Sequence, residues 1–368
     1  LNVTGTGQAS PQGGLTQGQI TDMDLSTRAI VKAVEEAMNT AGQAKVDGIQ
    51  FKGENLRDSI TISSSDRIIT AADRDRVLEQ ATNSCKLAKE ELVLHRIPQI
   101  FHIKGQRDIR NPVGMFGETL EAEVRIIVAP SPVIMNIQLA LKNAGLHGSE
   151  LMYSPLASAE AILSREDREN GAVVVDIGEQ LTHLGIFLHG TLFHSAVIPI
   201  GGAHFTRDLE ITKHLGGITA SERVKIRFGT VLPSHVPAEE SIELEEEGRL
   251  VSRREIAEVL QARAAELLNL VLAEMGRTGV MHEIHGGVHL VGGGALLTHL
   301  PILAQTLLGR PRVVLGRIQG VVGLPQATGN PFFVNALGAV KALSRDMNET
   351  RGKQDRGDGF LGRFKKLF

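Results

Sequence analysis

The sequence predicts a mixed α/β protein, and two buried strands separated by helices are the main reason. Ala172–Ile177 and Gly287–Val291 are almost entirely apolar, as expected for strands that are covered on both faces. A long helix is expected between them, from about Ser252 to Met275, because its apolar residues recur along one side. Strands of this kind that alternate with helices are typical of α/β folds.

A smaller α+β unit is predicted ahead of these strands, over residues 69–148. The segment Thr70-Ala-Ala-Asp73 resembles a capping box, with Asp in place of Glu or Gln, and opens a helix that runs to about residue 90. Two strands follow, Ile97–Ile103 and Glu121–Ala129. A helix between Pro132 and Gly145 then closes the unit.

A further helix is expected nearer the start of the chain. Thr21 or Asp22 can cap it, and Ile30, Val34 and the pair Ala37 and Met38 follow helical spacing through about residue 41.

Composition excludes several classes of protein. The 368 residues carry a net charge of −3, which is too small to indicate nucleic acid as the main partner. Cys85 is the only cysteine, so an intramolecular disulfide and a metal site of paired cysteines are both excluded. No apolar stretch reaches the roughly 18 residues that a membrane-spanning helix needs. The sequence starts at Leu1 rather than at Met, which leaves open whether the N-terminus is native.

Glycines follow the predicted strands in the manner of a nucleotide site. Asp176-Ile-Gly178 ends a buried strand, where a carboxylate can hold hydrated Mg²⁺ and main-chain amides can approach phosphate; an ordinary turn explains it equally well. The turns Gly292-Gly293-Gly294 and Gly201-Gly202 also bring main chain close to a ligand. Glu222 and Lys225 lie one helical turn apart, and they bind either a ribose or base, or each other.

These motifs, in this order, resemble the nucleotide frame of the actin-like ATPase superfamily, and longer stretches resemble the bacterial division family FtsA. The resemblance covers nearly the whole chain. The stretches are Arg110-Asn-Pro-Val-Gly114, Leu120-Glu-Ala-Glu-Val124, Pro155-Leu-Ala-Ser-Ala-Glu160, Ser195-Ala-Val-Ile-Pro-Ile-Gly-Gly202, Glu222-Arg-Val-Lys225 with Phe228-Gly229, Ser252-Arg-Arg-Glu-Ile-Ala257 and Gly292-Gly-Gly-Ala-Leu296.

The resemblance implies an actin-like fold of duplicated ribonuclease H-like domains, with an inserted α+β subdomain that serves protein contacts. It implies ATP with Mg²⁺ as the ligand, held by Asp176 through water, by the glycines above and by Glu222 and Lys225. The implied division of the chain is 1–68 for a partial first subdomain, 69–148 for the insert, 149–170 for the return, 171–200 with 275–344 for the second subdomain, 201–274 for a small subdomain, 345–359 for a flexible linker and 360–368 for a terminal helix.

Two departures from the family pattern argue against brisk hydrolysis. The family opens with a strand that carries a first phosphate loop, and this sequence begins after it, by truncation or by loss. The second loop reads Asp176-Ile-Gly-Glu-Gln-Leu-Thr-His183, so Glu179 and Gln180 replace glycines beside the phosphates. His183 and Glu160 are weak catalytic expectations, since each is also plausible as a structural residue. ATP binding is therefore expected, with hydrolysis in doubt.

The last nine residues predict an interfacial membrane anchor. On a helix of about 100° per residue, the apolar side chains fall within an arc of about 120° and the cations lie outside it. The residues are Phe360, Leu361, Arg363, Phe364, Lys365, Lys366, Leu367 and Phe368. Partial burial of five apolar side chains contributes roughly 5 to 10 kcal/mol, and each cation about 1 kcal/mol near anionic lipid. The alternative is a terminal helix docked on the body of the protein.

The resemblance implies a membrane adaptor of the division ring. It implies a peripheral protein on the cytoplasmic face of the bacterial cell membrane that self-associates, binds anionic lipid and other division proteins, and tethers FtsZ filaments. The FtsZ tail is expected on residues 201–274, with Arg253 and Arg254 as contacts or merely as solvated side chains. Two alternatives are a scaffold of the pilus-assembly type and an ATP-hydrolysing enzyme of the same fold, such as a sugar kinase.

Overall fold

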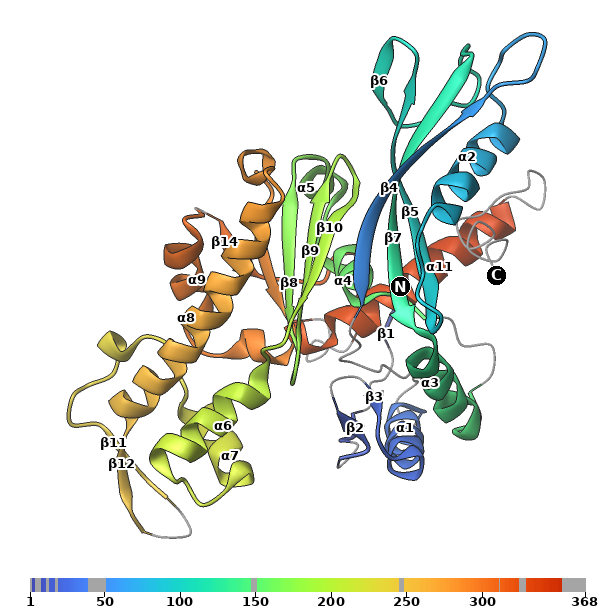
Figure 1. Ribbon diagram of the computed structural model, residues 1–368. Helices are drawn as coiled ribbons and strands as arrows, with labels where there is room; N and C mark the ends of the chain where they lie inside the picture. The colour runs from blue at the N-terminus through green and yellow to red at the C-terminus, as the bar shows by residue number, and fades with distance from the viewer. Residues whose placement is uncertain are drawn as a thin grey trace.

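The computed structural model describes residues 2–3, 8–10, 13–16, 19–38, 51–146, 151–244, 248–310, 312–323 and 329–352. These residues form two parts, with the helices α4 (Ser154–Ile162) and α11 (Val334–Gly352) running between them (Figure 1). One part is built around a five-stranded sheet and the other around a four-stranded sheet. Among the described residues, no helix is long and apolar enough to cross a membrane.

The five-stranded sheet has the order β10-β9-β8-β13-β14. The second strand, β9, is antiparallel to both of its neighbours, while β8, β13 and β14 are parallel. This is the ribonuclease H-like arrangement, so the expected actin-like α/β class is confirmed. The strands are β8 (Ala172–Ile177), β9 (Thr182–Leu188), β10 (Thr191–Ile198), β13 (Gly287–Val291) and β14 (Val313–Leu315).

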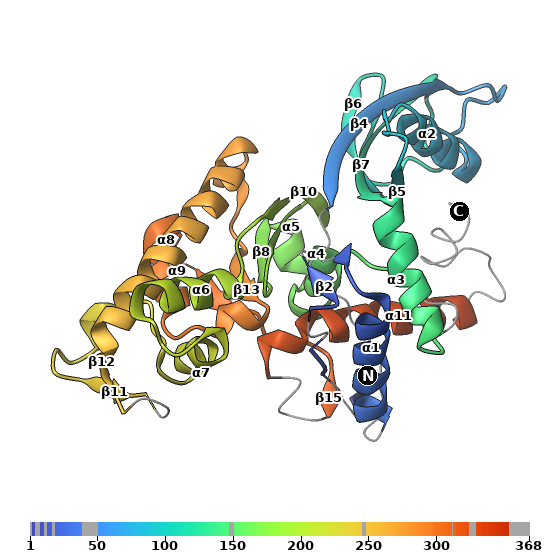
Figure 2. The same cartoon turned by 60° about the horizontal axis from the view of Figure 1, so that its bottom comes forward.

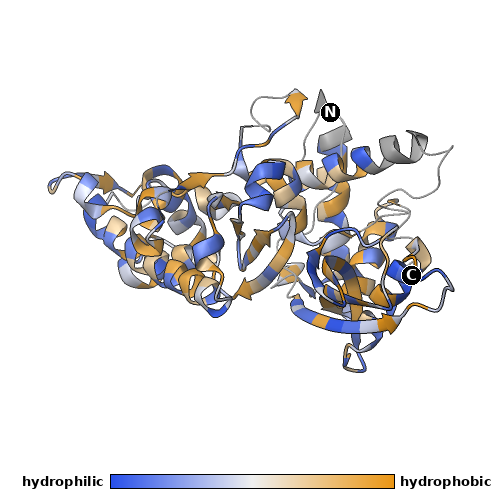
Figure 3. Cartoon of the chain, turned by 90° about the horizontal axis from the view of Figure 1, so that it is seen from above, coloured by the Kyte–Doolittle hydropathy of each residue, from blue (hydrophilic) through white to orange (hydrophobic). Residues whose placement is uncertain are grey.

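The largest hydrophobic core lies between this sheet and its helices. Val173, Val175 and Leu290 of the strands are fully buried in it. The helix expected from Ser252 forms, and Ser252 caps it. The remaining elements here are α6 (Gly202–Lys213), α7 (Ile218–Phe228), η1 (Pro233–His235), β11 (Ser241–Glu243), β12 (Leu250–Ser252), α8 (Arg253–Arg277), η2 (Met281–Glu283), η3 (Gly293–Leu296) and α9 (Leu300–Leu308). In Figure 3 these helices alternate between orange and blue, as expected for helices that cover a core with one side.

The four-stranded sheet forms the predicted α+β unit, which we call the insert, with strand order β4-β7-β5-β6 and one covering helix, α2. Thr70 and Asp73 make both bonds of the expected capping box. Two expectations about this unit were wrong: α2 ends at Asn83 rather than near residue 90, and β4 lies before residue 69 although it pairs with β7 along its whole length. The elements are β4 (Lys52–Thr61), α2 (Ala71–Asn83), β5 (Glu91–Ile103), β6 (Gln106–Ile109) and β7 (Thr119–Pro130).

Short strands and helices complete the fold. The amide of Leu25 donates to Asp22, which confirms Asp22 as the first cap, and α1 packs beside α3 (Figure 2). The flexible linker was expected over residues 345–359, but α11 continues to Gly352, and residues 353–359 lie outside the described residues; polar residues of good helix propensity permit this extension of the helix. The elements are β1 (Asn2–Val3), β2 (Leu15–Thr16), β3 (Gln19–Ile20), α1 (Met23–Met38), α3 (Ser131–Asn143), α5 (Arg165–Glu169), β15 (Val322–Gly323) and η4 (Pro331–Phe333).

Candidate functional site

Asp176 lies at the carboxyl end of β8, where the expected site begins. It is 4% exposed, and its register partners are Val291 of β13 and His183 of β9. The side-chain amide of Asn335 donates to Asp176 Oδ2 at 2.6 Å, and Ser158 donates in turn to Asn335. A buried carboxylate is thereby held in one orientation by a neutral donor, which leaves its charge uncompensated by any cation among its described hydrogen bonds.

Gly292 packs directly against Asp176. Its φ of +84° is a conformation that L side chains rarely adopt, and an added Cβ would lie 2.5 Å from Ile177 O and 2.6 Å from Asp176 Oδ1. At Gly294 a Cβ would meet Ile177 Cγ2 at 2.3 Å, whereas Gly293 is exposed. The glycines therefore allow the turn after β13 to close onto the end of β8.

The turn between β8 and β9 packs against the start of α6. The amide of Gly202 donates to Gly178 O at 2.9 Å, and that of Ala203 donates to Glu179 O at 2.7 Å. A Cβ on Gly201 would lie 2.6 Å from Glu179 O. Free amides at a helix N-terminus form a natural anion site, but here protein carbonyls accept from two of them. The altered second loop thus occupies two amides at the start of α6 that could otherwise bind an anion.

Glu222 and Lys225 pair with each other at 2.7 Å, one of the two alternatives that the sequence left open. The pair is not a free surface pair, because Lys225 Nζ also donates to Gly202 O at 3.0 Å and to Thr206 Oγ1 at 2.9 Å. Thr206 donates to Glu222. The structure therefore brings α7 against the Gly201–Gly202 turn, so that these two glycines and the Glu222–Lys225 pair lie next to each other.

The two weak catalytic residues lie in different surroundings. Glu160 on α4 pairs with Arg168 at 3.0 Å and with Arg345 at 2.7 Å, and these arginines lower its pKa although burial opposes them. Both carboxylate oxygens are thus engaged, which favours the structural role. His183 is buried beside Tyr153, with ring centroids 6.0 Å apart, and lies opposite Asp176 in the sheet. Cross-strand partners share a face of the sheet, so only His183 stays close to the site.

Arg253 and Arg254 are engaged inside the chain. Arg253 donates to Phe228 O at 3.0 Å and pairs with Glu240 at 2.6 Å. Arg254 donates to Val236 O from two nitrogens, at 3.2 and 2.8 Å. Their guanidinium groups hold the segment before β11 against the start of α8, which makes them positioning residues in the structure rather than solvated side chains.

The arrangement fits hydrated Mg²⁺ with a nucleotide in part. Asp176 supplies one fixed carboxylate, which suits an ion that keeps most of its water. No group of three or more potential metal ligands occurs among the described residues. Glu222 and Lys225 pair with each other, and two amides at the start of α6 donate to carbonyls of the β8–β9 turn.

Comparison with known proteins decides the family. The family described as "Cell division protein FtsA" matches residues 173–338, and the "SHS2 domain inserted in FTSA" matches residues 48–128. The cell division protein FtsA of Pseudomonas aeruginosa is 32% identical over 348 residues, with 92% of this chain and 82% of that protein covered. The chain belongs to the FtsA family of cell-division proteins.

Other FtsA proteins support the same assignment. FtsA of Escherichia coli K12 is 30% identical over 357 residues, covering 92% of this chain and 84% of that protein. FtsA of Neisseria meningitidis serogroup B is 29% identical over 384 residues, covering 100% of this chain and 91% of that protein. The insert match starts at residue 48 and so takes in β4, in agreement with the sheet and not with the expected start at residue 69.

A solved structure shares the fold. The "PilM-PilN type IV pilus biogenesis complex" aligns with a TM-score of 0.63 at 17% identity, covering 89% of this chain and 88% of that chain. At this identity the likeness shows the fold and nothing about shared partners.

Three residues of the site and its surroundings could not be predicted from the sequence. Asn335 orients Asp176 from a helix 159 positions away, and Thr206 joins the Glu222–Lys225 pair. Arg125, on β7 of the insert, is buried against β10. No glycine, motif or spacing marks any of them, because each acts through a contact between distant segments.

Proposed function

We propose that this FtsA-family protein is a membrane adaptor that tethers FtsZ filaments at the division site. The observation that carries the proposal is the similarity to FtsA proteins over at least 92% of the chain. The protein acts as a peripheral component on the cytoplasmic face of the cell membrane and associates with itself and with other division proteins. In this role it binds a lipid surface.

The membrane contact is assigned to residues 360–368, which lie outside the described residues. Their apolar side chains and the cations Arg363, Lys365 and Lys366 give the composition of an interfacial helix. Self-association strengthens such an anchor, since several weak tails then act together.

Co-sedimentation with anionic vesicles tests the anchor. The whole chain is expected to pellet, while Phe364→Glu and a chain ending at Gly359 stay in the supernatant. Phe116→Glu is the matched control, because Phe116 is 67% exposed on the insert, far along the sequence from the tail. Equal pelleting of all four proteins would contradict the anchor.

We further propose that ATP with Mg²⁺ binds at the Asp176 region and turns over slowly. Asp176, Gly178, Gly201, Gly202, Glu222, Lys225 and Gly292–Gly294 form the site. Slow turnover follows from the β8–β9 turn, whose carbonyls accept from the α6 amides that would otherwise bind phosphate. Catalysis of phosphoryl transfer is mostly positioning and charge stabilisation, which this turn does not supply.

Calorimetric titration with ATP in the presence of Mg²⁺ tests the site. Lys225→Ala is expected to weaken affinity about tenfold, because it removes the cation that ties α7 to Gly202 O. The control is Lys213→Ala, which removes a lysine paired with Glu255 at the far end of α6. Unchanged affinity in Lys225→Ala, or phosphate release at many turnovers per second, would contradict the proposal.

FtsZ is proposed to dock on residues 201–274. Arg253 and Arg254 contribute to this surface by holding the chain between α7 and β11 in place, as their bonds to Phe228 O and Val236 O indicate. Binding of an FtsZ tail peptide by fluorescence anisotropy, before and after Arg254→Ala, checks this role.

A further inference from the structure

Arg125 is a buried cation without a carboxylate partner. It lies on β7, is 2% exposed, and makes no ion pair with any described residue. Burial lowers its pKa to about 10. All of its described acceptors are neutral: Asn55 Oδ1 at 2.7 Å, Phe193 O at 3.3 Å, Ser195 O at 3.0 Å and Ser195 Oγ at 2.9 Å. Such a charge loses hydration on burial and regains only hydrogen bonds.

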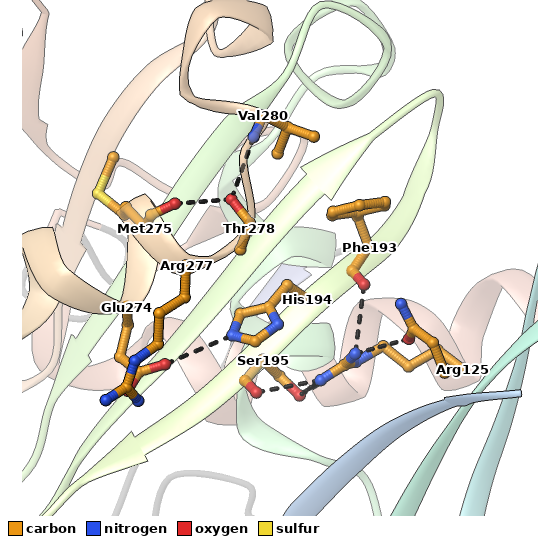
Figure 4. A network of polar contacts seen from close by, with 10 residues as sticks. Arg125, Phe193, His194, Ser195, Glu274, Met275, Arg277, Thr278 and Val280 are labelled. Atoms are coloured by element: carbon orange, nitrogen blue, oxygen red, sulfur yellow. Dashed lines mark hydrogen bonds and ion pairs between the residues drawn. The ribbon is translucent and has the colours of Figure 1, made fainter.

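The acceptors of Arg125 belong to two different parts of the protein. Asn55 lies on β4 of the insert, whereas Phe193 and Ser195 lie on β10 of the five-stranded sheet. Figure 4 shows the guanidinium reaching from its own strand to the main chain of β10. Arg125 therefore joins the insert to the rest of the molecule through its side chain.

The strand that Arg125 contacts is the edge of its sheet. β10 is hydrogen-bonded to β9 on one side only, and the register shifts between Leu192 and His194. Edge strands present unpaired carbonyls, and a bulge turns one of them outward. Gln99 of the insert also donates to Leu192 O at 3.0 Å and to Phe193 O at 3.1 Å. The insert thus covers this edge with side-chain donors instead of another strand.

The fit around Arg125 is close. A Cβ on Gly53 would lie 2.2 Å from Arg125 Nη2 and 2.6 Å from Ser195 Oγ, so the backbone of β4 leaves just the room that the contact needs. At the periphery Arg110 pairs with Glu169 of α5 at 2.5 Å. His194, between the two parts, faces Glu274 at 3.7 Å, and burial and Arg125 together lower its pKa.

β10 leads directly into the candidate nucleotide site. It ends at Ile198, and the chain then reaches Gly201 and Gly202 at the start of α6. Thr182 donates to Ile200 O at 2.7 Å, which fixes this connection to the neighbouring strand. A shift of β10 at Ser195 therefore moves the turn that Lys225 contacts.

We infer that Arg125 is a positioning residue that couples the orientation of the insert to the nucleotide site through β10. Neutral acceptors make the contact easy to release, because a freed guanidinium recovers its hydration. The nucleotide and the insert then influence each other through one strand, and linkage requires that the influence run both ways. The nucleotide half of this inference rests on the proposed function; the contact itself does not.

Hydrogen exchange with peptide-level resolution tests the contact without any ligand. In Arg125→Gln, amides of β10 and of β5 near Gln99 are expected to exchange at least about tenfold faster, while β8 and β13 keep their protection. Ser195→Ala is a milder variant that removes one acceptor and leaves the charge, and Arg125→Lys is expected to restore part of the protection. Arg57→Gln is the control, because Arg57 lies on the neighbouring strand β4 with an exposed side chain that pairs with Glu121 instead of β10. Unchanged exchange in β10 in both Arg125→Gln and Ser195→Ala would overturn the inference.

Addition of ATP with Mg²⁺ tests the coupling. The nucleotide is expected to slow exchange in the insert of the wild type, and in Arg125→Gln this effect should vanish while affinity falls at least about fivefold. A residue that only stabilises the fold would leave the effect of the nucleotide on the insert intact, and that result would overturn the coupling. If the wild type binds no nucleotide, the proposed ATP site fails, and the exchange comparison without ligand still decides the role of Arg125.

Discussion

At the scale of single residues, close contacts between backbone segments define the site. Asp176, Gly292 and Asn335 come from three segments and meet within hydrogen-bond or van der Waals distance. The glycines could be found from the sequence, because three in succession are rarely needed for a turn. Asn335 could not be found, because an asparagine near a helix start is ordinary and its partner is far away in the chain.

Gly292 offers a direct test at this scale. Gly292→Ala is expected to lower the free energy of unfolding by about 3 kcal/mol or more, because φ is +84° and the new Cβ would meet Ile177 O at 2.5 Å. Gly309→Ala is the matched control: its φ is +60° and nothing lies within 4 Å of a Cβ, so about 1 kcal/mol is expected. Denaturant unfolding measures both. Equal losses would show that the turn does not press on β8.

The ion pairs of Glu160 predict how the stability of the protein depends on pH. Arg168 and Arg345 lower its folded-state pKa, so the ion pairs stabilise the protein above the unfolded pKa of about 4.3, and this stability is lost as the pH falls through the lower folded value. Glu160→Gln is expected to lower the free energy of unfolding by about 2 kcal/mol at pH 7. Below pH 4.5 the melting temperature of the variant should depend less on pH than that of the wild type. Glu118→Gln, in an exposed pair with Arg67, should change stability by less than about 1 kcal/mol. A steep acid dependence that persists in Glu160→Gln would assign it to other carboxylates.

At the scale of elements, the pattern of apolar residues and the residues that begin or end a helix decided what could be predicted from the sequence. β8 and β13 are buried at every position, so their sequences are almost wholly apolar. β4 reads Lys-Gly-Glu-Asn-Leu-Arg-Asp-Ser-Ile-Thr and is fully buried at one position only, so its sequence did not assign it to the insert. The boundary at residue 69 was wrong for this reason. The helix α11 continues beyond residue 345, where a linker was expected, because polar residues alone do not end a helix.

Helix caps allow a comparison between the two parts of the molecule. Thr70→Ala removes the box that opens α2 and is expected to cost about 1 kcal/mol. Ser252→Ala should cost less than half of that, because its single bond to the amide of Glu255 is 3.4 Å long. Thermal unfolding of both variants checks the order. A larger loss in Ser252→Ala would contradict the view that the Thr70 box is the stronger cap.

At the scale of the whole molecule, the insert, the candidate nucleotide site and residues 201–274, where FtsZ is proposed to dock, meet around one sheet. β10 is covered by the insert at its edge and continues into α6, whose neighbour α7 carries Lys225. The C-terminal end of α8 approaches the same strand through Glu274 and His194. One strand, β10, therefore contacts or continues into all three of these regions, which is consistent with the proposed adaptor role.

Recruitment of FtsZ to anionic vesicles by this chain tests the adaptor role most directly. FtsZ, vesicles and the chain are mixed and centrifuged, with Phe364→Glu as the variant without an effective anchor. FtsZ is expected to pellet with the vesicles when the whole chain is present and to stay in solution with the variant. If the chain itself pellets while FtsZ remains in solution, the protein binds membrane but does not tether FtsZ, and the proposed adaptor role is wrong.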